Sequence, residues 1–523
     1  MNVLTIVAPT VEWPLLLPLI VVFGGAVLGV LVEAFAPRPS RYVLQTLIAV
    51  VALLAAGASV AMRLGGFESQ FLAMETIVLD GPTLIFWMML LLFGLGGVAL
   101  FAERGVGEGQ SAFAPSASSA PGSPLEREAV RLRREHTEVF PLLLFSLLGM
   151  MLFSAANDFI LLFVALEVLS LPLYMLSAMA RRRRLLSQEA GLKYFLLGSL
   201  ASGVFLYGIA MIYGFSGSLK VTGLAAAVSA GAENQWLLLV GMLLITVGLL
   251  FKIGAVPFAS WTPDVYMGAP TPVTGFMAIA TKMAAVAALM RVLFVGFGGA
   301  QWHWQPVLAV VAILSMVVGA VVAIWQTDLK RLLAYSAITH AGFLLVGVVG
   351  AVVRTDDVFV TSVGAAAFYL LTYGLATLGA FGLLMTVRRA GGEATAIEDW
   401  KGLGKTNPLT ASIMTVFFLS FAGIPLTAGF VGKLAVFVAA FQGGYGWLTI
   451  VAIVMSVVAA YFYLKVIVAM WFDTAPEDSE VVVRTPSLWV WTLVLIGALA
   501  TILLGILPGG MLEMMSNLSE FVG

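Results

Sequence analysis

Apolar runs of about twenty residues recur along the whole chain, and this repetition constrains the fold more than any other feature of the sequence. Hydrophobic residues make up 61% and charged residues 11% of the 523 residues, against about 25% charged residues in a soluble domain. Lipid offers no water to unpaired backbone groups, so each run that crosses a membrane must be helical. The sequence therefore predicts an all-α polytopic membrane protein rather than a soluble domain with one anchor.

The apolar runs predict fourteen transmembrane helices. No Lys or Arg precedes the first run, which is also longer than the core of a signal peptide, so it is expected to be a retained helix. The predicted ranges are 14–35, 42–62, 80–102, 139–156, 158–180, 189–214, 236–264, 270–297, 306–326, 332–352, 358–387, 408–441, 446–472 and 487–508.

The basic residues predict the orientation of these helices. Loops that follow odd-numbered helices hold eighteen Lys and Arg residues, whereas loops that follow even-numbered helices hold three: Arg63, Lys220 and Arg354. Basic residues concentrate on the cytoplasmic side of a membrane. The odd-numbered loops are therefore expected in the cytoplasm, with both ends of the chain outside the cell inner (plasma) membrane.

The long loop at 104–138 separates helices 1–3, in residues 1–103, from the rest of the chain. Its first part, "GVGEGQSAFAPSASSAPGSP", has low complexity and is expected to be disordered. Its second part, "LEREAVRLRREHTEV", is expected to form a short surface helix. Two five-helix units follow at 139–297 and 306–472, and residues 487–523 hold helix 14 and a tail.

Several kinds of site are excluded by residues that the chain lacks. There is no cysteine, and the three histidines are scattered, so thiolate metal sites, cysteine-held iron–sulfur clusters and a haem pair are not expected. No GxGxxG or P-loop pattern occurs. We therefore expect no redox centre, metal or nucleotide in this chain.

Six cations fall inside predicted spans, where a charge costs about 2.5–3.5 kcal/mol on insertion scales. Lys282 and the acidic Glu167 are predicted near the membrane midplane, and Lys193 lies nearer the cytoplasm, where it could meet Glu167. Lys252 and Lys433 lie beside prolines in the two longest segments. The remaining two, Arg291 and Lys465, lie closer to helix ends, and snorkelling is an equally good reading for both.

The prolines beside these two lysines predict broken helices. Pro257 in "FKIGAVPFASW" and Pro425 in "FAGIPLTAGFVGK" lie in helices 7 and 12. A broken membrane helix is tolerated where the break is buried in protein or hydrated. Because the breaks lie five helices apart, they predict two inverted repeats, helices 4–8 and 9–13.

The histidines carry weaker signals. His340 lies within helix 10 in "YSAITHAGF", and the sequence leaves open whether it relays protons or only packs. His136 and His303 are expected to be structural residues in loops.

These residues resemble the antiporter-like membrane subunits of proton-pumping NADH–quinone oxidoreductase, respiratory complex I, over essentially the whole chain. "WTPDVY" is more similar to subunit N than to the paralogous subunits L and M, and the chain lacks room for the lateral helix of L. Ala259 and Leu426 depart from the family, in which many relatives have histidine and proline there. The matching segments are "FVALEVLSLPLYMLSA" with Glu167, "QEAGLKYFLLGSLAS" with Lys193, "FKIGAVPFASWTPDVYMGAPTPV" with Lys252, "ATKMAAVAALMR" with Lys282, "QTDLKRLLAYSAITHAGF" with His340 and "LSFAGIPLTAGFVGKLAVF" with Lys433.

The resemblance implies a non-redox subunit that couples quinone reduction to proton pumping through a buried Glu/Lys axis. It implies flavin, iron–sulfur clusters and quinone in partner subunits, and contacts with subunits M, K and J. The site residues would be Glu167, Lys193, Lys252, Lys282, Lys433 and His340. The alternative is a subunit of an Mrp-type cation/proton antiporter, which would share the fold and most of the lysines.

A mechanism follows from the same residues. Burial disfavours the charged form of an amine, and a nearby carboxylate favours it. If Lys193 moves closer to Glu167, that carboxylate supports the charge of Lys252 less, and Lys252 would release its proton toward Lys282 and Lys433.

Overall fold

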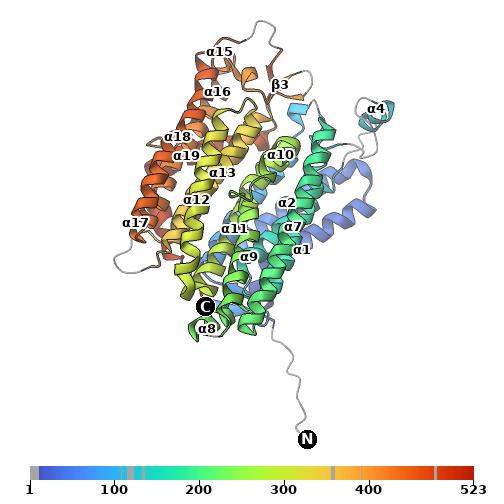
Figure 1. Cartoon of the computed structure of the whole chain (residues 1–523). Coiled ribbons are helices and arrows are strands. Elements are labelled where there is room, and N and C mark those ends of the chain that lie inside the picture. Colours follow the sequence, from blue (N-terminus) through green and yellow to red (C-terminus); the bar gives the residue numbers. More distant parts are fainter. Residues whose placement is uncertain are drawn as a thin grey trace.

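The computed structural model describes residues 11–66, 68–107, 109–114, 123–131, 136–231, 233–354, 360–389, 392–475 and 480–523. This part of the chain forms a bundle of long helices (Figure 1). Twelve of its helices are long and apolar enough to cross a membrane, and three shorter apolar helices, α5, α16 and α17, accompany them. The predicted polytopic helical fold is confirmed, while the number of crossings and the inverted repeats stay predictions.

The helices are α1 Trp13–Phe35, α2 Arg38–Ala61, α3 Gly81–Phe101, α4 Pro124–Arg131, α5 Val139–Ala155, α6 Phe159–Ser177, α7 Arg184–Ser216, α8 Val221–Ser229, α9 Gln235–Ile253, α10 Trp261–Gly268, α11 Thr271–Arg291, α12 Gln301–Ile324, α13 Leu329–Gly350, α14 Ser362–Leu384, α15 Leu403–Thr406, α16 Pro408–Ala422, α17 Ala428–Gln442, α18 Gly446–Trp471, α19 Leu488–Ile506 and α20 Gly509–Asn517. Short strands lie in the connections: β1 Gln70–Leu72 pairs antiparallel with β2 Ile77–Leu79, and β3 Val387–Arg389 lies between β4 Gly392–Glu393 and β5 Val482–Val483.

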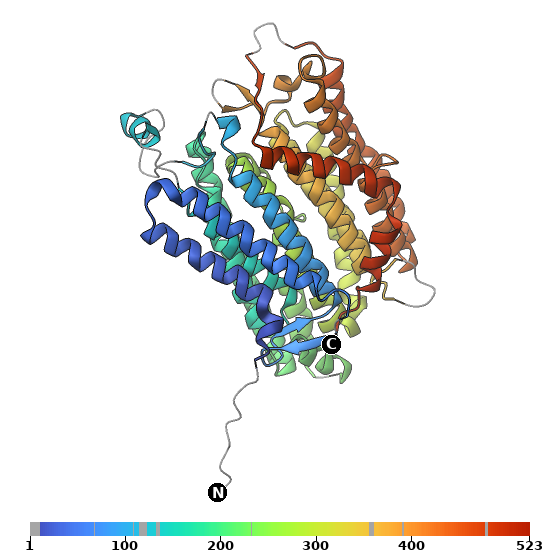
Figure 2. The same cartoon turned by 180° about the vertical axis from the view of Figure 1, so that it is seen from behind.

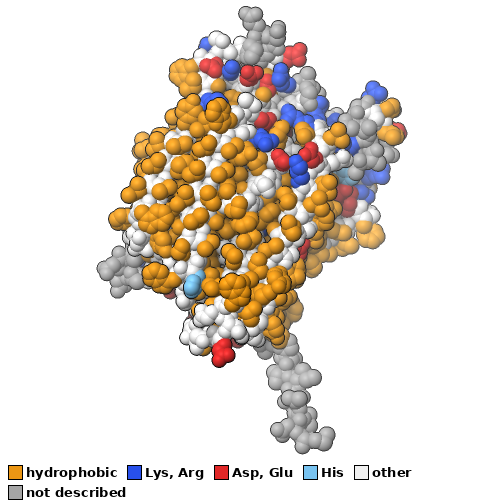
Figure 3. All heavy atoms as spheres, viewed as in Figure 1, with side chains coloured by type: hydrophobic (Ala, Val, Ile, Leu, Met, Phe, Trp, Pro, Cys, Tyr) orange, Lys and Arg blue, Asp and Glu red, His pale blue; other side chains and the backbone are white. Residues whose placement is uncertain are grey.

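The centre of the bundle is formed by α11, α13 and α14. All residues of α11 and α14 are buried, and α13 is buried except at Arg331 and Tyr335 in its first two turns. The outer helices α1, α2, α7, α18 and α19 expose many Leu, Val and Ile side chains. Figure 3 shows a broad hydrophobic surface of this kind on one face of the molecule, as expected where lipid replaces water around the protein.

The two ends of the bundle differ in charge. Lys and Arg side chains gather at the end that carries α10, α15 and β3 (Figures 1 and 3). The C-terminus lies at the opposite end beside β1 and β2, where α1 also begins (Figure 2). Both ends of the described chain thus lie on one side, opposite the basic end. That the basic end faces the cytoplasm stays a prediction.

Part of the loop expected to be disordered is ordered. Backbone hydrogen bonds of 2.8 and 2.9 Å join residues 112–114 to residues 179–181. Phe113 is buried there, and its ring centre lies 5.1 Å from that of Phe101. The contact between these two rings buries apolar surface and orders this part of the loop. The low-complexity composition gave no indication of it. The predicted surface helix is present as α4, whereas residues 115–122 and 132–135, including Arg133 and Arg134, lie outside the described residues.

The two histidines expected in loops differ. His136 lies in the connection before α5 and contacts Glu138, and this hydrogen bond raises the pKa of His136 above its ordinary value. His303 is exposed in the first turn of α12, so its placement in a loop was wrong. His303 is an exposed polar residue at the start of the helix, so hydropathy alone placed it before the predicted span at 306–326.

Both predicted breaks are present, and glycine ends the helix at each. At α9, Gly254 has φ 76° and its N–H donates to backbone carbonyls of the last turn. At α16, Gly423 has φ 79° and makes the same kind of cap. Such left-handed caps favour glycine, and a proline after the cap prevents the helix from continuing. Proline alone, as inferred from the sequence, therefore does not account for the breaks.

The orientation makes a testable prediction in this cysteine-free chain. Glu128 lies exposed on α4, and Glu233 lies exposed at the opposite end between α8 and α9. We expect a membrane-impermeant maleimide to label a Glu233→Cys variant in intact cells and to label a Glu128→Cys variant only in inverted membranes. Labelling of the α4 cysteine from outside would reverse the topology.

Candidate functional site

Three buried lysines lie within apolar helices, one each on α9, α11 and α17. Lys252 is in the last turn of α9, Lys282 is midway along α11, and Lys433 is in the second turn of α17. Each side chain is only 3% exposed. All three were predicted to be buried, and a buried amine is costly unless neighbouring groups interact with it.

Lys252 has the sparsest surroundings. Within the described residues its Nζ makes no hydrogen bond. It lies 5.2 Å from the ring centre of Tyr174 and 5.1 Å from that of Tyr194, within the range of cation–π attraction. The carboxylate that acts on it electrostatically is Glu167 of α6. Lys252 is thus an amine supported by two aromatic faces and one distant negative charge.

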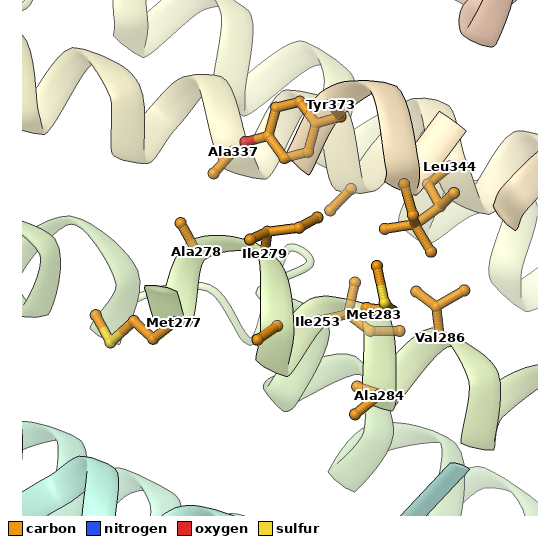
Figure 4. Close-up of a cluster of buried hydrophobic side chains, with 14 of the residues drawn as sticks. Ile253, Met277, Ala278, Ile279, Met283, Ala284, Val286, Ala337, Leu344 and Tyr373 are labelled. Carbon is orange, nitrogen blue, oxygen red and sulfur yellow. The ribbon is translucent and has the colours of Figure 1, made fainter. Parts of the chain in front are cut away.

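Lys282 is bound through the backbone. Its Nζ donates a 2.5 Å hydrogen bond to the carbonyl of Ala337 on α13, and lies 5.4 Å from the ring centre of Tyr373. Figure 4 shows apolar side chains of α11, including Ile279 and Met283, facing Tyr373 and Leu344. The lysine is therefore set in a packed apolar region and not in an open channel.

Lys252 and Lys282 line one narrow cavity, together with polar groups that include Thr262, Tyr266 and Thr281. The cavity is too narrow to hold a water molecule in this conformation. A proton can pass between the two amines only after side chains separate and admit water. The structure thus represents a closed state of this connection.

His340 lies at the centre of a polar cluster. Its Nδ1 is 2.5 Å from the hydroxyl of Tyr369, and its Nε2 is 3.0 Å from the hydroxyl of Tyr463. Tyr463 also bonds to the hydroxyl of Ser336. The imidazole stacks on Tyr373 at 4.5 Å, and the charges of Lys282 and Lys433 both act on it. His340 therefore lies between the two lysines with a hydroxyl on each ring nitrogen.

Lys433 binds the end of a broken helix. Its Nζ donates hydrogen bonds of 3.0 Å each to the carbonyl of Ala422, the last residue of α16, and to the hydroxyl of Ser456 on α18. It also lies 4.8 Å from the ring centre of Phe343. The C-terminal end of a helix attracts cations because its last carbonyls have no partner within the helix. The break at Gly423 thus creates the acceptor that holds Lys433.

The expected contact between Lys193 and Glu167 is absent. Lys193 pairs with Glu189 at 2.6 Å and with Asp264 at 2.7 Å, and its side chain is 41% exposed. Glu167 is partly buried on α6 and makes no hydrogen bond or ion pair with the rest of the described chain. Asp264 lies on α10, the second half of the broken helix. Because it is far from Lys193 in the sequence, the sequence did not indicate that it is the closer carboxylate.

Two further cations differ from what the sequence suggested. Arg291 does not snorkel: it is 2% exposed and binds both carboxylate oxygens of Asp80 at 2.8 and 2.9 Å, with Thr83 at 2.8 Å. Lys330, counted with the loop cations, is buried in the first turn of α13 and donates 2.8 Å to the carbonyl of Ala269. Lys465 is exposed and donates to a helix-end carbonyl, as expected for a snorkelling side chain.

The pair between Arg291 and Asp80 is expected to be structural. Removing one partner of a buried pair leaves an uncompensated charge, which costs about 3–5 kcal/mol. We expect Arg291→Met to lower the amount and thermal stability of the assembled protein in membranes, measured by native gel after heating. Lys465→Met is the control and should match the wild type. An unchanged melting profile for Arg291→Met would contradict this role.

Sequence reasoning did not identify the hydroxyl and carboxyl groups that surround these cations and His340. They are Tyr369, Tyr463, Ser336, Ser456, Asp264 and Asp80. The sequence feature that could have indicated Asp80 and Asp264 is the position of an acidic residue at the edge of or within an apolar segment. Tyrosine and serine are common in membrane helices, so nothing in the sequence marks these four.

The described residues contain no group of three or more His, Cys, Asp or Glu that could hold a metal ion. The polar groups at the centre are amines, hydroxyls and one imidazole. Such groups exchange protons in water, and shared neighbours connect them: Lys252 and Lys282 line one cavity, Tyr373 contacts both Lys282 and His340, and Phe343 contacts both His340 and Lys433. The arrangement can therefore bind and transfer protons within a membrane-embedded bundle.

Comparison with known proteins agrees with this geometry. A family model described as "NADH:quinone oxidoreductase/Mrp antiporter, TM" matches residues 156–459. The chain is 53% identical to NADH-quinone oxidoreductase subunit N of Cutibacterium acnes, over 99% of this chain and 97% of that one. It is 51% identical to the protein of the same name from Nocardioides sp., over 99% of both chains.

Solved structures show the same fold. A chain of respiratory complex I from Thermus thermophilus superposes with a TM-score of 0.75 at 32% identity, covering 95% of this chain and 98% of that chain. A chain of the Mrp complex from Dietzia sp. superposes with a TM-score of 0.80 at 22% identity, covering 97% of both, which is evidence for the fold alone. The present chain therefore belongs to the family of NADH-quinone oxidoreductase subunit N, within the NADH:quinone oxidoreductase/Mrp antiporter membrane family.

Proposed function

We propose that this chain is a proton-translocating membrane subunit of a bacterial NADH–quinone oxidoreductase, embedded as a multi-pass protein in the plasma membrane. The observation that carries the proposal is the buried line Lys252, Lys282, His340 and Lys433. The three buried amines inside the bundle are costly, and ionisable groups placed inside a membrane protein commonly mark a proton pathway. The whole-length similarity to subunit N supplies the identity of the complex.

The proton moves along this line in steps. Glu167 stabilises the ammonium form of Lys252, because opposite charges attract strongly where water is excluded. When that support weakens, Lys252 gives up one proton toward Lys282 through the cavity that they share, once it widens. The hydroxyls around His340 then pass a proton toward Lys433, whose contact with the end of α16 lies at the second break.

The driving energy comes from partner subunits in this proposal. Quinone reduction occurs elsewhere in the complex, where flavin and iron–sulfur clusters reside, and this chain holds no redox centre itself. The neighbours are expected to be the antiporter-like subunit M and the small subunits K and J. The reaction of the complex is then coupled to this chain only through changes in shape and charge at its surface.

Purification of the tagged chain from its native membranes tests the assignment. We expect it to recover quinone-linked subunits with flavin and iron–sulfur clusters, and reconstituted vesicles should acidify on addition of NADH and quinone. An Mrp-type antiporter is the second candidate, because the Dietzia sp. Mrp chain has the same fold. Recovery of antiporter subunits, with sodium-driven proton movement and no NADH oxidation, would replace the first assignment with the second.

A further inference from the structure

Asp264 joins three helices at the charged end of the bundle. It lies on α10, and its Oδ2 is 2.7 Å from the Nζ of Lys193 on α7. Its Oδ1 is 3.5 Å from Nη1 of Arg331 on α13. Asp264 therefore has two cationic partners on two different helices, only one of which is part of the proposed proton path.

A second contact joins the same helices next to Lys252. Tyr194, the residue after Lys193, is buried and stacks on Trp261 of α10 with ring centres 4.6 Å apart and planes at 9°. Its ring centre is 5.1 Å from the Nζ of Lys252. Trp261 donates a 3.0 Å hydrogen bond to the carbonyl of Phe251, the residue before Lys252. The partly exposed ion pair of Lys193 with Asp264 and the buried stack of Tyr194 on Trp261 thus both connect α7 to α10.

Glu167 is the acid that lacks a partner in this arrangement. It interacts with Lys252 through its charge and makes no ion pair with the described residues. Because α6 packs against α7, its carboxylate is the alternative partner for a lysine on α7. If Lys193 moved from Asp264 to Glu167, Arg331 would still neutralise the carboxylate of Asp264. No uncompensated negative charge would then remain on α10.

We propose that Asp264 is a positioning residue that holds Lys193 on α10 and away from Glu167 in the loaded state of the site. This inference rests on the proposed proton path. While Lys193 is held, the free charge of Glu167 stabilises the ammonium of Lys252. Transfer of Lys193 from Asp264 to Glu167 neutralises that charge, and Lys252 then loses one proton to the path. Return of Lys193 to Asp264 restores the free charge of Glu167, and the neutral amine of Lys252 then takes up a new proton from water.

Removing the charge of Asp264 tests the proposal in the assembled complex. We expect Asp264→Asn to reduce NADH-driven proton pumping about fivefold or more, since coupling energies between linked sites are typically of this size. Asp264→Glu keeps the carboxylate and should restore most of the rate. Glu189→Gln is the matched control, because it removes another carboxylate 2.6 Å from the same lysine without touching α10, and it should retain most of the rate.

A double variant separates positioning from simple stability. If Asp264 acts through Lys193, Asp264→Asn should slow a Lys193→Met complex no further, because the two residues act as one unit. A multiplicative loss in the double variant would overturn the proposal, as would wild-type pumping by Asp264→Asn.

Arg331→Gln gives an independent readout that leaves the pair of Lys193 with Asp264 in place. It removes the cation that compensates Asp264 when Lys193 leaves, so we expect pumping to fall about fivefold. A wild-type rate for this variant would count against the exchange even if Asp264→Asn does not assemble. If Lys252→Met abolishes pumping while these variants do not change it, only the inference about Asp264 fails.

Discussion

Replacing Lys252 by methionine is expected to abolish NADH-driven proton pumping in a complex that still assembles. Methionine fills a similar volume among Tyr174 and Tyr194 but has no group that binds a proton. Because Lys252 makes no hydrogen bond within the described residues, its loss leaves no hydrogen-bond acceptor unpaired in the core. We expect pumping and coupled quinone reduction to fall together by about 100-fold, the range in which proton-transferring side chains act.

Two companion variants define what the Lys252→Met result means. Lys252→Arg should also fail, because a guanidinium stays charged and cannot release the proton. Lys465→Met, which removes an exposed amine bonded only to a helix-end carbonyl, should pump normally. The measurement is fluorescence quenching by inverted vesicles that contain equal amounts of assembled complex. Wild-type pumping by assembled Lys252→Met complex would contradict the proposed path.

The helices and their buried lysines could be predicted because both follow from local hydropathy along the sequence. Twenty apolar residues specify a span, and a cation inside such a span is conspicuous wherever it lies. The depth predicted for Lys282 required only counting along a helix, and Lys252 and Lys433 were noticed as cations beside prolines in apolar segments; all three are buried. The breaks were also local, since glycine and proline lie within four residues of each other at both sites.

The partners of these charges could not be predicted, because they come from distant parts of the chain. Asp264 is 71 residues from Lys193, and Asp80 is 211 residues from Arg291. Which of two acids a lysine binds depends on the rotation of α7 against α6 and α10. Hydropathy carries no information on that rotation once all three helices are apolar. The same limit concealed the burial of Lys330 and of Arg291.

The second large effect is expected at His340, whose role the sequence left open. A neutral imidazole donates at one nitrogen and accepts at the other, so its two hydroxyl partners give the ring a defined direction. A proton that enters from Tyr369 can leave toward Tyr463 when the donor and acceptor nitrogens exchange roles. A packing histidine requires no hydroxyl at both nitrogens, so the pattern favours a relay between Lys282 and Lys433.

His340→Phe should therefore reduce pumping about tenfold or more while the complex still assembles. Phenylalanine can keep the stack on Tyr373 at 4.5 Å, but it interrupts the hydroxyl–imidazole chain. Phe421→Leu is the matched control, because it alters an aromatic neighbour 5.8 Å from His340 without removing a hydrogen bond, and it should retain most of the rate. Tyr463→Phe should resemble His340→Phe, since it removes the hydroxyl that links the imidazole to Ser336. If His340→Phe pumps as fast as Phe421→Leu, the histidine only packs, and protons reach Lys433 by another route.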